Sequence, residues 1–200
     1  MNVSEAIKRR RSIAKFDPHH TMSESEIREL IEAAHQTPSA FNIQHWRFVN
    51  IASPELREKF SEIAWHQPQV RSASLLLLIC ADLKAWAKEP ERYCASAPDE
   101  YRANILEAMR NYYKDHPQTQ RDEGFRSSSM AAMTLMLKAQ EMGYDSCAMG
   151  GFDADKAAEL VNLPNDYAIC MMLAIGKKAA EPYPKEEQLA LDEIVVTDSF

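Results

Sequence analysis

Hydrophobic residues recur along this chain with two periods, one helical and one typical of strands. A helical face is predicted by four apolar residues, Ile27, Leu30, Ile31 and Ala34. Ser23 and Glu26 precede that face as a capping box, so the helix is predicted to begin there. The largely apolar run from Ser74 to Cys80 has the length of a strand and predicts a central strand covered on both faces.

Similar patterns place further elements before and after these two. Other helices are predicted from Asn2, from Ser53-Pro54, across 101–113, across 130–142 and from Asp153. Other strands are predicted at 46–51, 144–149 and 167–175. Residues 85–125 carry the weakest pattern. Because the sequence contains neither repeats nor a low-complexity linker, we expect one domain over residues 1–200, layered as α/β or α+β.

Composition narrows the classes of partner. The chain has 200 residues, of which 46% are hydrophobic and 26% charged, and a net charge of -7. Nucleic acids and anionic membranes require an extended basic face, so neither is an expected partner. The expected partners are small molecules or proteins. The longest apolar run is far shorter than the ~20 residues of a membrane span, and the first residues lack a signal-peptide pattern. These features predict a cytoplasmic protein.

The four cysteines show no metal-binding or redox pattern. They are scattered along the chain, without a C-x-x-C pair or histidines at zinc-ligand spacing: Cys80, Cys94, Cys147 and Cys170. We therefore expect free thiols, no metal, and no cysteine nucleophile.

A nucleotide phosphate, if one binds, must be held by side chains. The chain has only 5 glycines and contains neither a dinucleotide-binding fingerprint nor a Walker loop. The one dense cationic cluster is Lys8-Arg9-Arg10-Arg11, followed by Ser12. Two guanidinium groups and a hydroxyl can satisfy several phosphate oxygens at once. The alternative is that these charges merely complement the dipole of a helix that ends there.

The order of the neighbouring motifs favours the phosphate site. Arg10-Arg11-Ser12, then Phe16, then Pro38-Ser39-x-x-Asn42-x-Gln44-x-Trp46-x-Phe48 together resemble the N-terminal signature of the nitroreductase family. That signature comprises two motifs. A third, Gly143-Tyr144 followed by Gly150-Gly151-Phe152-Asp153, and a fourth, Ile175-Gly176-Lys177 with Leu191 to Val195, are also similar to that family. Each motif is weak alone, but the four in order are fairly specific.

The resemblance implies an α+β fold, with a central mixed β-sheet flanked by helices, and an intertwined homodimer with FMN at its interface. It assigns Arg10, Arg11 and Ser12 to the ribityl phosphate. Pro38, Ser39 and Asn42 would come from the partner subunit, with Asn42 at the pyrimidine edge of the flavin and Gln44 close enough to assist. Lys185 is our candidate for the family's C-terminal phosphate contact. The family often carries a basic residue where this chain has Ala14.

The resemblance also gives Gly150 and Gly151 a role, because their backbone N–H groups would lie near flavin N5 and O4. Adjacent glycines after a strand let a planar ligand approach the backbone closely. The alternative is a tight strand-to-helix turn. Trp65, His66 and Gln67 are interpreted as surface or core residues, and Tyr112, Tyr113 and Phe125 as weaker candidates for the substrate channel.

The implied activity is ping-pong hydride transfer by FMN, from NADH or NADPH to an electron-poor acceptor such as a nitroaromatic or a quinone. The flavin performs the chemistry, so no catalytic side chain is named. Other flavin reactions on the same scaffold, such as ene reduction, dehalogenation or flavin breakdown, stay open, as does a flavin-binding protein without turnover.

Overall fold

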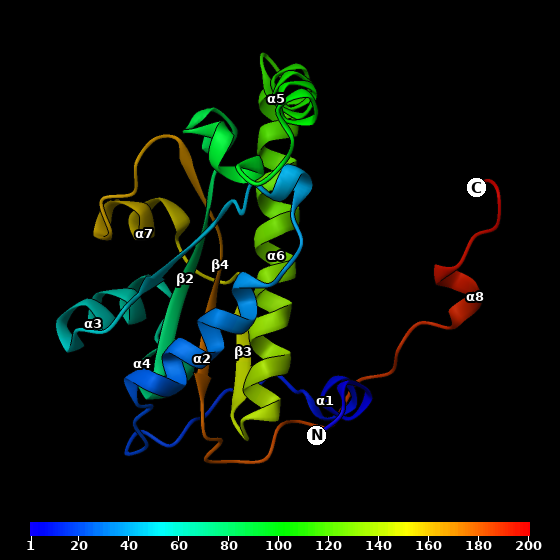
Figure 1. Ribbon diagram of the computed structural model, residues 1–200. Coiled ribbons are helices and arrows are strands. Elements are labelled where there is room, and N and C mark those ends of the chain that lie inside the picture. The colour runs from blue at the N-terminus through cyan, green and yellow to red at the C-terminus, as the bar shows by residue number, and fades with distance from the viewer.

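A four-stranded sheet forms the centre of the computed structural model, which describes residues 1–200 (Figure 1). Its strands are β1 (Trp46–Asn50), β2 (Leu75–Asp82), β3 (Asp145–Met149) and β4 (Tyr167–Gly176), in the order β1-β2-β4-β3. All three neighbouring pairs are antiparallel. The α+β class is therefore confirmed, whereas the expected mixed sheet is wrong for these strands. The one parallel contact is an isolated bridge between Ser12 and Ser146.

The direction of the strands follows from their connections, which hydrophobic patterns do not report. Parallel neighbours need a connector that carries the chain back along the strand. Between β3 and β4 the only helix is α7 (Ala154–Leu160), which is about 10 Å long at 1.5 Å per residue. Strand β3 is about 16 Å long. The connector therefore delivers the chain near the end of β3 that it left, and the two strands pair antiparallel.

Strand β2 is buried along its whole length and separates two apolar layers. Leu76, Leu78 and Cys80 face one layer, where α3 (Pro54–Ile63), α4 (Pro68–Ser72) and α7 pack. Leu75, Leu77 and Ile79 face the other, where α2 (Glu24–His35) and α6 (Pro117–Glu141) pack. Each fully buried leucine contributes about 1.5–3 kcal/mol. The predicted central strand is thus the middle of a three-layer core, as Figure 1 shows.

The ends of the predicted helices are confirmed by their capping contacts. Asn2 caps α1 (Val3–Arg9) and Ser23 caps α2, each in a reciprocal capping box. Ser53 and Asp153 cap α3 and α7 through their side chains. Gly143 follows α6 with a φ of +74°, in the left-handed region that glycine adopts without strain.

Residues 85–125, which the sequence left poorly defined, are helical. They form η2 (Ala85–Ala87), η3 (Pro90–Cys94), α5 (Asp99–Tyr113) and the first turns of α6. Helix α6 begins at Pro117, well before the predicted residue 130, and its buried positions are mostly small residues without an apolar period. At Gly124 an added Cβ would stand 3.0 Å from the Cβ of Ala81, so the helix lies directly against β2.

The last residues, 181–200, form an extended arm that leaves the body of the molecule (Figure 1). We call this segment the C-terminal arm; its one helix is the short α8 (Leu191–Ile194). Nearly all of its residues are exposed, including several large apolar ones: Tyr183, Leu189, Leu191, Ile194, Val195, Val196 and Phe200. No helix of the protein combines the length and apolar character needed to cross a membrane.

Candidate functional site

The basic cluster lies where α1 ends and the chain becomes extended. Arg10 is the C-cap of α1, and the Ile13 N–H donates to the Ser146 carbonyl at 3.1 Å, which fixes the segment beside the start of β3. Arg10 and Arg11 are half-buried and Ser12 is exposed. Neither guanidinium forms an ion pair within the chain; Arg11 Nη2 donates to the Tyr183 carbonyl instead. Both positive charges are therefore available to an external anion.

Two further residues lie near this positive region: the thiol of Cys147 is affected by its charge, and Lys185 adds a further positive charge. Burial raises the pKa of the Cys147 thiol, and the nearby charge of Arg10 opposes that increase. Lys185 is exposed, and it follows by two residues the Tyr183 carbonyl that Arg11 holds. The contact between Arg11 and the C-terminal arm thus keeps Lys185 on the same side of the molecule as the basic cluster.

Strand β3 leads from Ser146 to the glycine pair, about 13 Å away at roughly 3.3 Å per residue. Neither the Gly150 nor the Gly151 N–H donates a hydrogen bond within the protein. No atom lies within 4 Å of the position that a Cβ on Gly150 would occupy. Neither glycine has a positive φ. A special backbone conformation therefore does not explain the pair, whereas close approach of a ligand to two free amides does.

Sequence reasoning missed the neighbours of this pair. Trp65 is 67% exposed, as its surface interpretation expects, yet its Cζ3 would lie 3.2 Å from a Cβ on Gly151. Gln67 Nε2 donates to the Gly151 carbonyl at 2.7 Å. These residues follow α3 and are far from Gly151 in sequence, and no spacing signal connects them. They set the shape of the glycine turn.

Residues 39–44, which we call the strained turn, are held in a rarely populated backbone conformation. They include η1 (Ala40–Asn42), and Phe41, Asn42 and Gln44 have φ values of 53°, 57° and 53°. Each such residue costs about 1–3 kcal/mol, so the conformation persists only where the surrounding structure imposes it. The Gln44 N–H donates to Ser39 Oγ at 2.9 Å, and Gln44 Nε2 donates to the Asn42 carbonyl at 3.2 Å. Pro38 and Asn42 are exposed, so the turn presents the Asn42 amide to solvent.

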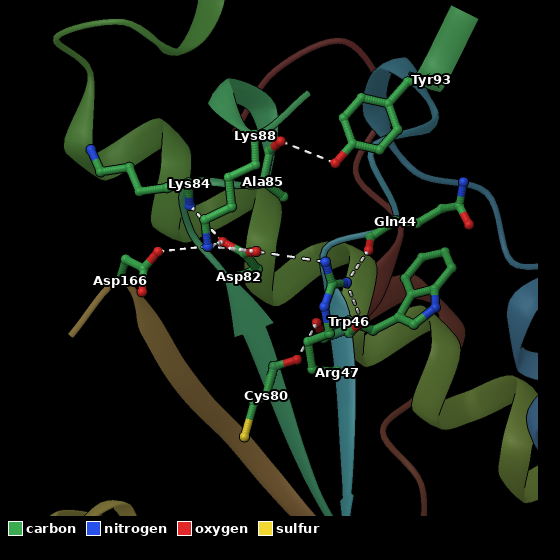
Figure 2. A network of polar contacts seen from close by, with 11 residues as sticks. Gln44, Trp46, Arg47, Cys80, Asp82, Lys84, Ala85, Lys88, Tyr93 and Asp166 are labelled. Atoms are coloured by element: carbon green, nitrogen blue, oxygen red, sulfur yellow. Dashed lines mark hydrogen bonds and ion pairs between the residues drawn. The ribbon is translucent and has the colours of Figure 1, made fainter. Parts of the chain in front are cut away.

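A network of charged residues lies beneath this turn (Figure 2). Arg47 Nη1 donates to the carbonyls of Gln44 and Trp46, at 3.0 and 2.8 Å. The Asp82 carboxylate, with a side chain only 1% exposed, lies 3.6 Å from Arg47 Nη2 and accepts two hydrogen bonds of 2.9 Å from Lys88. Burial alone would lower the pKa of Lys88, but Asp166 and Asp82 raise it overall. Sequence analysis did not identify this network; the one local signal for it is the charged Asp82 at the end of the apolar strand β2.

Aromatic residues pack around the strained turn. Tyr113 is fully buried, so it cannot line a substrate channel. Tyr112 is 44% exposed and its ring lies 5.9 Å from that of Phe41, between centroids. His45 is buried near Tyr113 with neither ring nitrogen hydrogen-bonded, and burial lowers its pKa to about 4. The exposed aromatic surface next to Asn42 is therefore Phe41 and Tyr112.

Within one chain, the structure does not bring the strained turn to the basic cluster. Helix α1 packs against the C-terminal half of α6, and the turn packs against the end of α5 through Ile43 and Tyr113. In Figure 1 the two regions lie toward opposite ends of α6. The predicted site residues thus form two separate groups on each chain.

A groove of about 490 Å³ lies beside the edge strand β1. It lies between α2, β1 and η3, and its lining includes Ile31, Trp46, Phe48, Leu77, Arg47 and Arg92. Arg92 forms no ion pair within the chain. The groove therefore offers an apolar floor, two arginines and the unpaired backbone groups of a sheet edge.

Comparisons with known proteins agree on one family. The profile of the nitroreductase family matches residues 7–177. Protein DrgA of Synechocystis sp. is 50% identical over 181 residues, which cover 90% of this chain and 86% of DrgA. The oxygen-insensitive NADPH nitroreductase of Helicobacter acinonychis is 30% identical over 192 residues, with coverage of 92% and 91%. A protein of Exiguobacterium sibiricum, assigned as a nitroreductase and solved in complex with FMN, is 29% identical with a TM-score of 0.89, with coverage of 98% and 97%.

Proposed function

Because this chain belongs to the nitroreductase family, we propose that it binds FMN and transfers hydride from NADH or NADPH to an electron-poor acceptor by a ping-pong mechanism. The observation that carries the proposal is the path along β3. That path begins at two arginines without ion-pair partners and ends at two glycine amides without acceptors. An extended ligand with a phosphate at one end and an acceptor-rich ring at the other fits both ends.

The predicted site residues fit the phosphate and the ring of FMN. Arg10, Arg11 and Ser12 would hold the phosphate, with Lys185 as a further cation. The N–H groups of Gly150 and Gly151 would face flavin N5 and O4, where negative charge accumulates on reduction. Preorganised backbone donors at such a position stabilise developing charge without reorganisation. Pro38, Ser39, Asn42 and Gln44 would reach the flavin of the partner subunit, because the same chain keeps them away from its own basic cluster.

When bound, FMN supplies the two-electron chemistry. The protein's part is to orient the ring and to leave its face accessible. The Phe152 N–H donates to the Gly150 carbonyl at 3.2 Å, which helps to orient the peptide group that carries the Gly151 N–H. Gln67 Nε2 holds the next peptide group through the Gly151 carbonyl. Phe41 and Tyr112 offer a partly exposed aromatic surface beside Asn42, suited to a planar acceptor such as a nitroaromatic or a quinone.

The surfaces that one chain leaves open support the proposal of a homodimer. The C-terminal arm exposes apolar side chains and carries six acidic residues against one lysine. The groove beside β1 is apolar and contains Arg47 and Arg92. We infer that the arm of one subunit occupies the groove of the other, which matches its apolar character. Arg92, which has no ion-pair partner within the chain, offers its charge to the acidic residues of the arm, whereas Glu32 also lines the groove and Arg47 is paired with Asp82. The unpaired edge of β1 would then be covered.

The visible spectrum of the purified protein tests this proposal. We expect a yellow protein that releases FMN rather than FAD and that bleaches when NADH or NADPH is added without oxygen. Colourless protein that takes up no added FMN would contradict the proposal. Yellow protein that neither nucleotide bleaches would instead support a flavin-binding protein without turnover.

A further inference from the structure

We propose that Arg47, anchored by the buried Asp82, is a positioning residue that holds the strained turn in the conformation that presents Asn42 and Gln44 to a flavin. The inference rests on the proposed function for the identity of the ligand. The positioning itself rests on the geometry of the free chain, which can be measured without flavin.

The turn needs such a support because its side-chain hydrogen bonds stay within it, and packing of Ile43 ties it to α5 rather than to the sheet. Three of its residues have positive φ, and none of them is glycine. Within the turn, side-chain hydrogen bonds join Ser39, Asn42 and Gln44 to one another. These local contacts move with the turn and cannot fix it relative to the sheet. Strained residues persist only where surrounding structure imposes them.

Two contacts link this region to the sheet. The Asp82 N–H donates to the carbonyl of His45, directly after the turn, at 2.8 Å, and Arg47 reaches a carbonyl of the turn itself. Arg47 lies in β1, and its Nη1 bonds the carbonyl of Gln44, a residue in the left-handed region, and the carbonyl of Trp46 (Figure 2). One planar group therefore joins the end of the strained turn to the first residue of the strand. Lysine would keep the charge, but its single ammonium lacks the fixed fork that spans carbonyls and carboxylate together.

Asp82 in turn fixes Arg47. Its carboxylate is buried at the end of β2 and is held by Lys88 and by the backbone N–H of Lys84, at 3.0 Å. Trp46 pairs with Ala81 in the β1–β2 register, so Arg47 and Asp82 come from the same end of two paired strands. The carboxylate thus connects the turn to the most buried strand of the protein.

The chain contains a matched control for this argument. Like Arg47, the half-buried Arg57 donates to backbone carbonyls, in its case those of Ile51, Ala73 and Ser74. It lies on α3 and forms no hydrogen bond with any of the predicted site residues. Arg57→Lys therefore removes a comparable carbonyl-binding arginine outside the proposed site.

The first experiment measures the turn directly in flavin-free protein, by hydrogen exchange of the segment 39–46. Arg47→Lys should increase exchange of the Gln44 amide about 10-fold, since the hydrogen bonds of a charged group are lost. Asp82→Asn should act in the same direction. Arg57→Lys should leave this segment unchanged. Unchanged exchange in Arg47→Lys, or an equal increase in Arg57→Lys, would overturn the positioning role whatever the protein binds.

The second experiment connects the turn to the ligand. Arg47→Lys should weaken FMN and riboflavin by the same factor, about 10-fold, because it acts at the ring rather than at the phosphate. In an Asn42→Ala, Gln44→Ala background the same substitution should change either affinity less than about two-fold. Additive losses would overturn the proposal. Wild-type protein that binds no flavin would contradict the proposed function, whereas the exchange result would still stand.

Discussion

The two groups of predicted site residues are built in opposite ways. The basic segment, Arg10 to Ser12, has ordinary extended backbone, partly exposed side chains and no ion-pair partner. The strained turn has three left-handed residues and lies on buried Tyr113, His45 and Asp82. The first group provides charged side chains on an ordinary backbone. The second provides a particular backbone conformation, which the buried residues beneath it must maintain.

This difference predicts different sensitivities. Contacts made by partly exposed charges are screened by salt. Contacts made by a strained turn that lies on buried residues depend instead on packing and on the protonation of those buried groups. Phosphate binding should therefore respond to ionic strength, and ring binding to substitutions and pH changes in the core.

The largest effect is expected between the two groups, at Gly151. In Gly151→Val the new side chain would meet Trp65, since even a Cβ stands 3.2 Å from its ring. Overpacking and obstruction of the flavin face should together weaken FMN binding roughly 100-fold or more. Flavin titration and stopped-flow reduction measure this. Gly150→Ala is the matched control for folding: nothing lies within 4 Å of its Cβ, so its melting temperature should not change. If Gly151→Val reduces its flavin at the wild-type rate, the glycine pair only forms a strand-to-helix turn and does not contact the flavin.

The next largest effect is the loss of folding stability in acid that His45 causes. Burial places its folded-state pKa at about 4, against 6.5 for the unperturbed group. Between these values the unfolded chain binds the proton more readily, so stability is lost as the pH falls from 6.5 toward 4, by about 3 kcal/mol at most. Urea unfolding of His45→Phe should show this pH dependence flattened. The exposed His19→Gln should behave as wild type, and an unaltered slope in His45→Phe would refute the assignment.

Much of the fold could be predicted because its signals are local. The capping boxes at Asn2 and Ser23 and the apolar run of β2 each lie within a few residues, and each is confirmed. The strand directions could not, since they depend on how connectors return the chain. The start of α6 was missed because its buried face is made of small residues such as Gly124.

The candidate site divides in the same way. The motifs containing Arg11, Asn42 and Gly151 are contiguous and therefore visible in the sequence. Their supports are not, because Arg47 meets Asp82 only through the register of β1 on β2. Gln67 likewise reaches Gly151 only after α3 and α7 have packed on one face of the sheet.

A smaller effect is expected from Arg11→Ala. A hydrogen bond to a charged group contributes about 1.5–3 kcal/mol, so FMN binding should weaken roughly 10- to 150-fold. Riboflavin, which lacks the phosphate, should bind as it does to wild type. Fluorescence titration of flavin-free protein with both ligands measures the ratio. Equal weakening of the two would mean that the basic cluster only completes the end of α1.

The smallest effect should come from Ala14→Arg. Ala14 is exposed and follows Ser12 by two residues, so an arginine there adds a cation near the proposed phosphate. A partly solvated charge contributes about 0.2–1 kcal/mol, which corresponds to at most a few-fold tighter FMN binding. The gain should shrink at high salt, while riboflavin binding stays constant. A gain that persists in high salt, or that extends to riboflavin, would contradict a screened phosphate contact.

In the proposed dimer, each flavin site takes its phosphate-binding residues from one subunit and its strained turn from the other. Mixed dimers of an Arg11→Ala chain with an Asn42→Ala chain test this arrangement most directly. Such a dimer contains one intact site and one doubly altered site, so it should bind one FMN per dimer with wild-type affinity, although neither parent homodimer does. If the mixed dimers bind FMN no better than the parents, or if a monomer binds FMN as wild type does, the two groups do not meet across an interface and the account is wrong.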